Sequence, residues 1–258
     1  MRSSSLLVYC HLSCPVPDRK SCRRTRKAGY YLRKGDEIFQ TVDIMNLSPQ
    51  VQTVNLVIEW EFIEGTPAGF DIVFPVWLDV KGNCLNEGLG INGTDKIFTA
   101  KGGAGWTSKI TADLILMVPH IHDGNTKQEV YLDGQLACTS VPKYGESADF
   151  ITHEEPGDGH GHDHGDQSEH IYHVSSISQC VNVTKVVPGN RFTIESWYDF
   201  VQHVAQKDHH GELEPIMAIE FLYLARPQEE AMKHILEMKG GDLQAFQDQV
   251  RNNTAKAP

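Results

Sequence analysis

Apolar and polar positions alternate with a period of two in several short segments of the chain. In 54–62 every even-numbered residue is apolar or aromatic, and the even-numbered residues from Ile110 to Val118 repeat this pattern after Trp106. Alternation puts successive side chains on opposite faces of a β-strand, one face toward a core and the other near water. Both segments are therefore predicted to be strands. Comparable patterns predict further strands at 72–80, 129–132, 191–200 and 216–224.

Turn-forming residues separate these segments. Asp133-Gly134 and Pro188-Gly189-Asn190 are typical turn sequences. Many short strands at such spacing are typical of a sandwich or jelly roll rather than an α/β fold. We predict a mainly β protein, an antiparallel β-sandwich or jelly roll, with short C-terminal amphipathic helices at 229–238 and 243–250.

The pattern also suggests a domain organisation. Residues 1–29 have no apolar periodicity, which predicts a disordered or non-native leader. The sandwich domain is expected over 30–226. It is interrupted at 153–173 by a polar segment rich in glycine and histidine, called here the His-rich insert, which we expect to be a mobile loop. A helical tail is expected over 227–258.

Charge makes nucleic acid an improbable partner class. The formal net charge is −11, and residues 1–34 hold nine of the 23 basic residues but one of the 34 acidic residues. The remainder is thus strongly acidic and would repel a phosphate backbone. A nucleic-acid arm or localisation signal in the basic run 19–27 finds no support downstream. No stretch approaches the roughly 18 consecutive apolar residues of a transmembrane helix, so no transmembrane segment is expected.

Cysteines and glycosylation sequons favour an oxidising compartment. The six cysteines match no zinc template, and four Asn-x-Ser/Thr triplets occur, although such triplets also arise by chance. We expect a secreted or extracellular, disulfide-containing glycoprotein. The apolar run at 6–9 is too short for a convincing signal peptide. The cysteines are Cys10, Cys14, Cys22, Cys84, Cys138 and Cys180, and the sequons begin at Asn46, Asn92, Asn182 and Asn252.

The most specific chemical feature is a His-x-His pair, His120 and His122. Both continue the even parity of the strand that ends near Val118, so a strand extending past Pro119 would point both imidazoles to its core-facing side. Two imidazoles at i and i+2 on one strand can chelate one metal ion. The alternative is two hydrogen-bonded histidines at a turn.

A third metal ligand would favour the metal interpretation. Met217 opens the strand predicted at 216–224, where its most ordinary role is as a core methionine. Two imidazoles and a thioether are a soft ligand set that suits copper, especially Cu(I). Zinc would want a further nitrogen, thiolate or carboxylate. We therefore take His120, His122 and Met217 as the candidate metal ligands.

Other polar residues near these positions have open roles. His203, His209 and His210 precede the Met217 strand and either approach the site or are exposed. Asp123 is either an acceptor for an imidazole N–H or part of an Asp-Gly turn. The insert offers weak, flexible metal binding or is simply a solvated loop, because glycine flexibility works against fixed geometry. Its alternating histidines include His160, His162, His164, His170 and His173.

Several segments resemble a known family. The sequences of 118–124, 173–180, 188–200 and 214–217 are similar to the C-terminal domain of peptidylglycine α-hydroxylating monooxygenase. They resemble still more the fungal and plant proteins related to the stress-up-regulated nodulin family. The similarity covers roughly 106–225, and 30–105 only loosely.

The resemblance implies a jelly-roll fold in which a His-x-His pair and a methionine bind one copper. In this sequence those positions are His120, His122 and Met217. The family likeness also implies a disulfide between Cys138 and Cys180. This sequence departs from the family at a second copper. In the family, that copper is bound by histidines of an N-terminal domain, whereas residues 1–119 of this sequence contain only His11.

Three functions follow from these observations. The first is a mononuclear copper protein that activates O2 like a monooxygenase and acts on a small-molecule or peptide substrate. The second is a non-catalytic extracellular module that binds or buffers copper. The third is a stress-related structural or interaction protein. No P-loop, Gly-x-Ser-x-Gly or dinucleotide motif supports another chemistry.

Overall fold

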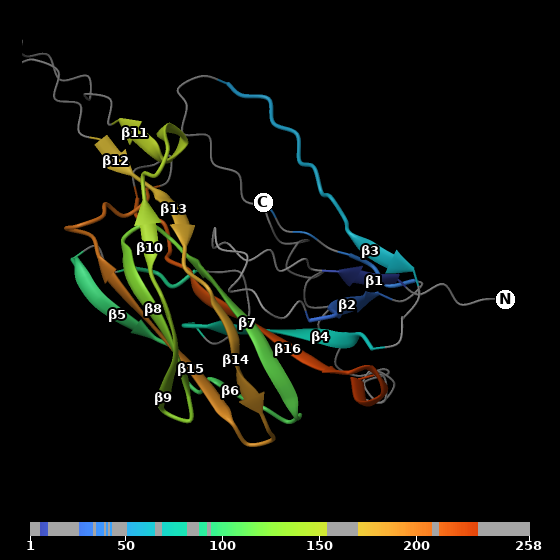
Figure 1. Ribbon diagram of the computed structural model, residues 1–258. Helices are drawn as coiled ribbons and strands as arrows, with labels where there is room; N and C mark the ends of the chain where they lie inside the picture. Colours follow the sequence, from blue (N-terminus) through green and yellow to red (C-terminus); the bar gives the residue numbers. More distant parts are fainter. Residues whose placement is uncertain are drawn as a thin grey trace, which may run out of the picture. The chain divides into compact units, whose positions relative to one another are not determined.

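The computed structural model shows a mainly β chain (Figure 1). It describes residues 6–9, 26–32, 35–38, 40, 42, 51–64, 69–81, 88–91, 94–153, 170–207 and 212–231. The chain divides into two compact units. Unit 1 contains 1–41, 56–74 and 225–258, and unit 2 contains 42–55 and 75–224. The units are described separately below.

Unit 2 contains two sheets. In the first, the strand order is β14 (Cys180–Val186), β7 (Ala112–Ile121), β16 (Ala218–Pro227) and β4 (Asp71–Asp79), with the ends of the last two strands in unit 1. In the second, the order is β5 (Ile97–Lys101), β15 (Arg191–Asp199), β8 (Asn125–Leu132) and β9 (Gln135–Ser140), and β6 (Trp106–Thr107) also pairs with β15. The registered neighbours β14–β7, β15–β5, β15–β8 and β8–β9 are antiparallel.

Short elements extend unit 2 beyond the sheets. Strand β10 (Pro142–Tyr144) pairs with β13 (Val174–Ile177), and β11 (Ile151–His153) pairs with β12 (His170–Tyr172). A 3-10 turn, η1 (Ala148–Phe150), precedes β11. These two ribbons carry the chain to and from the His-rich insert. Strand β12 lies inside the segment that we expected to be a mobile loop, so the last residues of that segment are structured.

The core of unit 2 is built from both sheets. Met117 and Leu222 come from the first sheet, and Phe192 and Val130 from the second. All four are at most 1 % exposed, so the inner faces of the two sheets are buried against each other. The predicted antiparallel β-sandwich is confirmed. Strand β15 shows the expected alternation most clearly, since its even-numbered residues are buried throughout.

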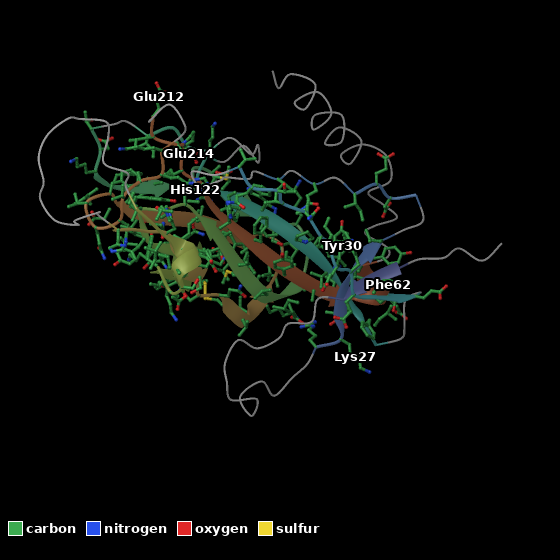
Figure 2. The ribbon with its side chains drawn as sticks, turned by 90° about the horizontal axis from the view of Figure 1, so that it is seen from above. Lys27, Tyr30, Phe62, His122, Glu212 and Glu214 are labelled. Atoms are coloured by element: carbon green, nitrogen blue, oxygen red, sulfur yellow. A yellow bond between two sulfur atoms is a disulfide. The ribbon has the colours of Figure 1, made fainter. Side chains whose placement is uncertain are left out.

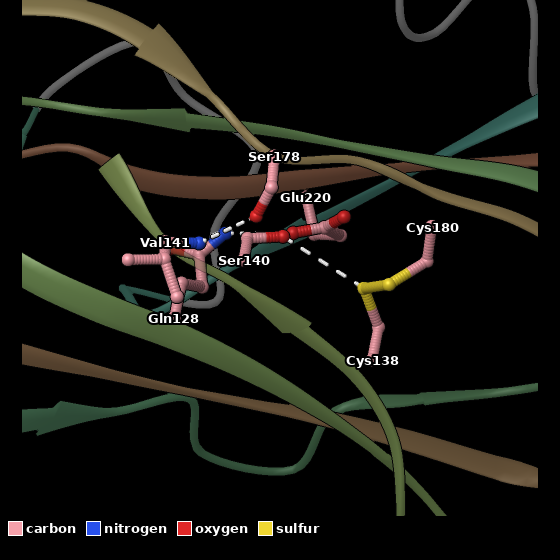
Figure 3. The surroundings of a disulfide bond; sticks show 7 residues. All are labelled: Gln128, Cys138, Ser140, Val141, Ser178, Cys180 and Glu220. Carbon is pink, nitrogen blue, oxygen red and sulfur yellow. Dashed lines mark hydrogen bonds between the residues drawn. A yellow bond between two sulfur atoms is a disulfide. The ribbon is translucent and has the colours of Figure 1, made fainter. Parts of the chain in front are cut away.

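A disulfide joins Cys138 on β9 to Cys180 on β14 (Figure 3). These strands are the edges of different sheets, so the bond cross-links the two layers. This confirms the pairing implied by the family resemblance. Closing a loop with a sequence separation of 42 stabilises the fold by about 4 kcal/mol in the loop-entropy model. The remaining cysteines lie outside the described residues.

Unit 1 contains three further strands of the seven-stranded sheet to which β4 belongs. Strand β1 (Leu6–Tyr9) lies between β2 (Ala28–Leu32) and β3 (Phe62–Glu64), with both pairings antiparallel. Strand β2 also pairs in parallel with the first residues of β4. Strand β1 and the start of β2 fall within 1–29, where the sequence predicted no regular structure.

The prediction of a strand at 54–62 is wrong. Residues 51–61 form no strand, and β3 begins only at Phe62. Their apolar side chains are exposed, Val51 at 98 % and Val57 at 74 %. Alternation shows which side chains share a face, but a strand also needs a neighbour that completes its backbone hydrogen bonds, and the described chain supplies none here.

Two further expectations differ from the structure. Strand β5 lies outside every strand predicted from the sequence. Residues 228–231 are helical, and the rest of the two helices predicted in the tail lies outside the described residues. Among the described residues, no helix has the length and apolar character needed to cross a membrane.

Candidate metal centre

The His-x-His pair lies at the end of β7. The strand continues past Pro119 as predicted, and His122 follows its last residue, Ile121. The imidazole rings of His120 and His122 are perpendicular, with ring centroids 5.6 Å apart. His120 is exposed and His122 half-buried, whereas Pro119 and Ile121 are buried. The pair therefore faces outward at the strand end, and the expectation that it faces the core is wrong.

The Met217 segment lies beside His122. Met217 immediately precedes β16 and is half-buried. The Nδ1 of His122 is 3.0 Å from the main-chain oxygen of Pro215, two residues before Met217. Figure 2 shows His122 close to Glu214, the residue before Pro215. A carbonyl oxygen only accepts, so Nδ1 carries the proton and donates it. This bond ties the strand that bears the histidine pair to the segment that bears the methionine.

The same hydrogen bond sets the tautomer of His122. With the proton on Nδ1, the lone pair is on Nε2, which is the form of the ring that binds a metal. A nitrogen–metal bond of about 2 Å puts the ion roughly 3 Å from the ring centroid. The 5.6 Å between the two centroids lies within the roughly 6 Å that two rings bound to one ion can span.

The described chain offers no conventional third ligand. Among the residues that the structure describes, no group of three or more His, Cys, Asp or Glu side chains could hold a metal ion. From this part of the chain, a third donor would have to be of another type, and Met217, the third ligand predicted from the sequence, would offer a thioether. That donor set suits copper better than zinc.

Tyr198 fixes the main chain of the Met217 segment. It is 1 % exposed, and its hydroxyl donates to the Met217 carbonyl at 2.8 Å. Burial raises the pKa of Tyr198, partly offset by hydrogen bonds from Ser196, Asn125 and the His122 main chain. The phenol therefore stays protonated and lies between the two segments that carry the candidate ligands.

Asp123 accepts a hydrogen bond from an imidazole, as one interpretation of the sequence proposed, but the imidazole belongs to His173. Its Oδ2 is 2.6 Å from His173 Nδ1, and its Oδ1 accepts the Val174 N–H at 2.8 Å. On the other side of the ring, Nε2 is 2.8 Å from the Thr152 hydroxyl. Asp123 is also part of the Asp-Gly turn, so the two interpretations are compatible.

His203 lies near the same residues. Its ring stacks on Tyr144, with centroids 3.7 Å apart, and Tyr144 donates to the Asn125 carbonyl. Burial lowers the pKa of His203, while the charges of Asp123 and Asp199 raise it. His203 thus approaches the residues that follow His122, one of the two outcomes the sequence left open.

The electrostatics of the exposed histidine also favour ligation. Although His120 has an exposed surface, the surrounding chain removes enough water from its ring to lower its pKa. A lower pKa keeps the imidazole neutral at neutral pH, the form that can bind a metal.

Comparisons with known proteins support the copper interpretation. The chain is 25% identical over 200 residues to "Probable copper-dependent oxygenase M1" from Phoma sp., an alignment that covers 78% of this chain and 46% of the relative. It is 24% identical over 204 residues to "Probable copper-dependent oxygenase clz3" from Cochliobolus lunatus, covering 78% of this chain and 58% of the relative. The chain spans about half the length of these curated relatives. No family model and no solved structure matches it.

Sequence reasoning missed Tyr198, Pro215, Thr152 and the role of His173. Tyr198 carried one signal, because its even parity on the strand predicted at 191–200 places it on the face that Phe192 buries. The others act through contacts between distant segments, which no local pattern encodes. His170 is exposed on β12. The remaining predicted histidines, His160, His162, His164, His209 and His210, lie outside the described residues.

Proposed function

We propose that the chain binds one copper ion through His120, His122 and Met217 and acts as an O2-dependent oxygenase on a small-molecule substrate. The observation that carries the proposal is the hydrogen bond from His122 Nδ1 to the Pro215 carbonyl, which sets the tautomer and brings the methionine segment to the histidine pair. The relatives named as copper-dependent oxygenases give independent support.

The residues of this chain would hold the copper ion and fix the positions of its ligands. His120 and His122 offer two imidazoles at a surface-facing strand end, where a substrate has access. The Tyr198 hydroxyl and the Pro215 carbonyl hold the main chain and the ring that frame the site. Bound copper would supply the redox chemistry for oxygenation. Inserting one oxygen atom of O2 into a C–H bond while reducing the other to water consumes two electrons, which an external reductant must provide.

The first test measures copper binding. Purified protein without an affinity tag should retain one copper per chain after dialysis, and His122→Ala should weaken Cu(I) binding by more than about a hundredfold, beyond the roughly 10- to 100-fold typical of losing a supporting hydrogen bond. His170→Ala removes an exposed imidazole outside the pair and should change nothing. Equal affinity in wild type and His122→Ala would refute the site.

The methionine ligand has its own matched control. Met217→Leu keeps the side-chain volume but removes the thioether, and we expect it to weaken Cu(I) more than Cu(II), because sulfur prefers the softer ion. Met117→Leu makes the same change at a buried position on β7 and should leave both affinities unaltered. If Met217→Leu binds Cu(I) like wild type, methionine is not a ligand.

Turnover separates an oxygenase from a copper-buffering module. With a reductant such as ascorbate, wild type should consume O2 in proportion to its bound copper, and His122→Ala should not. Copper binding without reductant-dependent O2 consumption across a panel of small molecules would favour the buffering function.

We also propose that the protein matures in an oxidising, secretory compartment. The cross-link between Cys138 and Cys180 supports this, because such disulfides persist mainly outside the reducing cytosol. Protein recovered from the native host's culture medium with these two thiols blocked is the expected result. Finding it in the cytosol with both thiols titratable would refute the proposal.

A further inference from the structure

We propose that Asp123 and His173 form a positioning pair that holds His122 in its ligating orientation. The inference rests on the proposed function and extends it to residues that would not touch the metal. Its basis is a chain of hydrogen bonds that begins at the residue next to His122.

The carboxylate of Asp123 fixes the direction of its hydrogen bond with His173. Asp123 is 7 % exposed, and the His173 side chain is 15 % exposed. A carboxylate only accepts, so His173 Nδ1 carries the proton that is donated to Oδ2. In the neutral ring the Nε2 atom then holds a lone pair, which accepts the Thr152 hydroxyl proton. Each polar atom of the Asp123–His173 contact has one defined role.

Both carboxylate oxygens of Asp123 accept hydrogen bonds from two consecutive residues, His173 and Val174. Oδ2 accepts from the His173 side chain and Oδ1 from the next residue's main chain, Val174. These donors come from the junction of β12 and β13, about 50 residues after Asp123. The two bonds therefore fix the residue that follows His122 to the junction of β12 and β13.

The residues after Asp123 are also held. The carbonyl of Gly124 accepts the Asp199 N–H at 2.8 Å, and the Asn125 side chain donates to the Ser196 hydroxyl at 2.7 Å. The main chain of His122 is thus followed by three consecutive anchored residues, while its ring is anchored by Pro215. Removing the Asp123 anchor should loosen the first link of this series, directly beside the ligand.

Rigid support of this kind determines metal affinity. A site binds tightly when its ligands are already close to the required geometry, and loss of an outer hydrogen bond typically costs about 10- to 100-fold in affinity. The sequence places His173 in the His-rich insert, where it would either bind metal weakly or be solvated. Both ring nitrogens of His173 are hydrogen-bonded to protein groups. His173 therefore acts as a positioning residue and not as a metal ligand.

The main test compares two substitutions of Asp123. Asp123→Ala removes both bonds and should weaken Cu(I) binding about 10- to 100-fold, measured by competition with the chromophoric chelator bicinchoninate. Asp123→Asn should recover most of the loss. Its carbonyl can still accept from Val174, and its amide N–H can donate to Nδ1 of the other His173 tautomer, with Thr152 then accepting from Nε2. A purely electrostatic role for the carboxylate predicts no such recovery and would overturn the proposal.

The matched control lies at the opposite end of β8. Asp133 also accepts one side-chain N–H, from Asn190 at 2.6 Å, and one main-chain N–H, from Arg191 at 2.7 Å. Asp133→Ala should therefore lose comparable bonds without changing Cu(I) affinity. Equal losses in Asp133→Ala and Asp123→Ala would show a general effect on stability and refute positioning.

A second readout keeps the proposal testable if Asp123→Ala folds poorly. Thr152→Val is isosteric and removes only the outer bond, so we expect it to fold and to broaden the Cu(II) electron paramagnetic resonance lines, with a loss of Cu(I) affinity of a few-fold. Unchanged spectra and affinity would count against the pair. If His122→Ala binds copper like wild type, the proposed metal site fails. If His122→Ala loses copper but Thr152→Val and Asp123→Ala do not, only the positioning role fails.

Discussion

The two ends of strand β8 carry the same dipeptide and use it differently. Asp123-Gly124 comes just before the strand and Asp133-Gly134 just after it. Both glycines have a positive φ, +90° at Gly124 and +79° at Gly134. Both aspartates accept one side-chain and one main-chain N–H. The local sequence and the hydrogen-bond count are thus alike at both ends.

Burial separates them. Asp123 is buried beneath His173, whereas Asp133 is exposed in an ordinary hairpin turn between β8 and β9. A Cβ added at Gly124 would lie 2.3 Å from the Phe200 ring, and one added at Gly134 would meet nothing within 4 Å. The comparison teaches that one turn only reverses the chain, while the other, next to the candidate ligand His122, is packed tightly against Phe200.

The largest expected effect comes from adding a methyl group at each glycine. Gly124→Ala combines a left-handed backbone strain of about 1–2 kcal/mol with overpacking of about 1–3 kcal/mol against Phe200, so unfolding should become about 2–5 kcal/mol easier. Gly134→Ala should cost only the backbone strain. Urea unfolding of the two variants measures the difference. Similar costs would show that the two turns are equivalent.

The middle of β8 should show a pH dependence that neither end shows. Gln128 donates to Glu220 at 2.8 Å, Glu220 is 0 % exposed, and its Oε1 has no hydrogen-bond partner in the described chain. Burial raises the pKa of Glu220 to about 7 from 4.5, and the Gln128 bond opposes this in part. The folded state thus holds the proton more tightly than the unfolded state.

The sign of the effect follows from that difference. The stabilisation is complete below pH 4.5 and is lost as the pH rises through about 7, a total on the order of 3 kcal/mol. Glu220→Gln should remove this slope from the free energy of unfolding between these pH values. Glu195→Gln, on the outer side of β15, should keep the wild-type profile. A slope that persists in Glu220→Gln would assign it to another group.

The sequence predicted those parts of the fold that local patterns encode. Alternation found the positions of β7, β15 and β16, and the Asp-Gly turn ended β8 as expected. It failed at 54–62, where side-chain parity is present but no neighbouring strand completes the backbone ladder. Alternation also gave the wrong direction for His120. At the end of β7 the odd-numbered residues Pro119 and Ile121 are buried, so the core-facing side of the strand end is the opposite of the predicted one.

The candidate site was predictable only in its ligands. His-x-His is a local motif, and the methionine came with the soft donor set and the family resemblance. The supporting contacts join residues 50 or more positions apart, such as His173 to Asp123 and His122 to Pro215. Such contacts depend on how the sheets and ribbons are placed, which no pattern within one strand determines.

The smallest expected effect comes from removing one hydroxyl at each end of β8. Tyr198→Phe loses the buried bond to the Met217 carbonyl at 2.8 Å, which should cost about 1–2 kcal/mol in unfolding free energy. Tyr131→Phe loses a bond to Glu129, and because Tyr131 is only half-buried we expect a cost of about 0.5 kcal/mol. Only Tyr198→Phe should also weaken Cu(I) binding, because only that hydroxyl holds a ligand-bearing segment. If both variants bind Cu(I) equally, the end of β8 at Asp123-Gly124 is better packed than the end at Asp133-Gly134 but does not support metal binding.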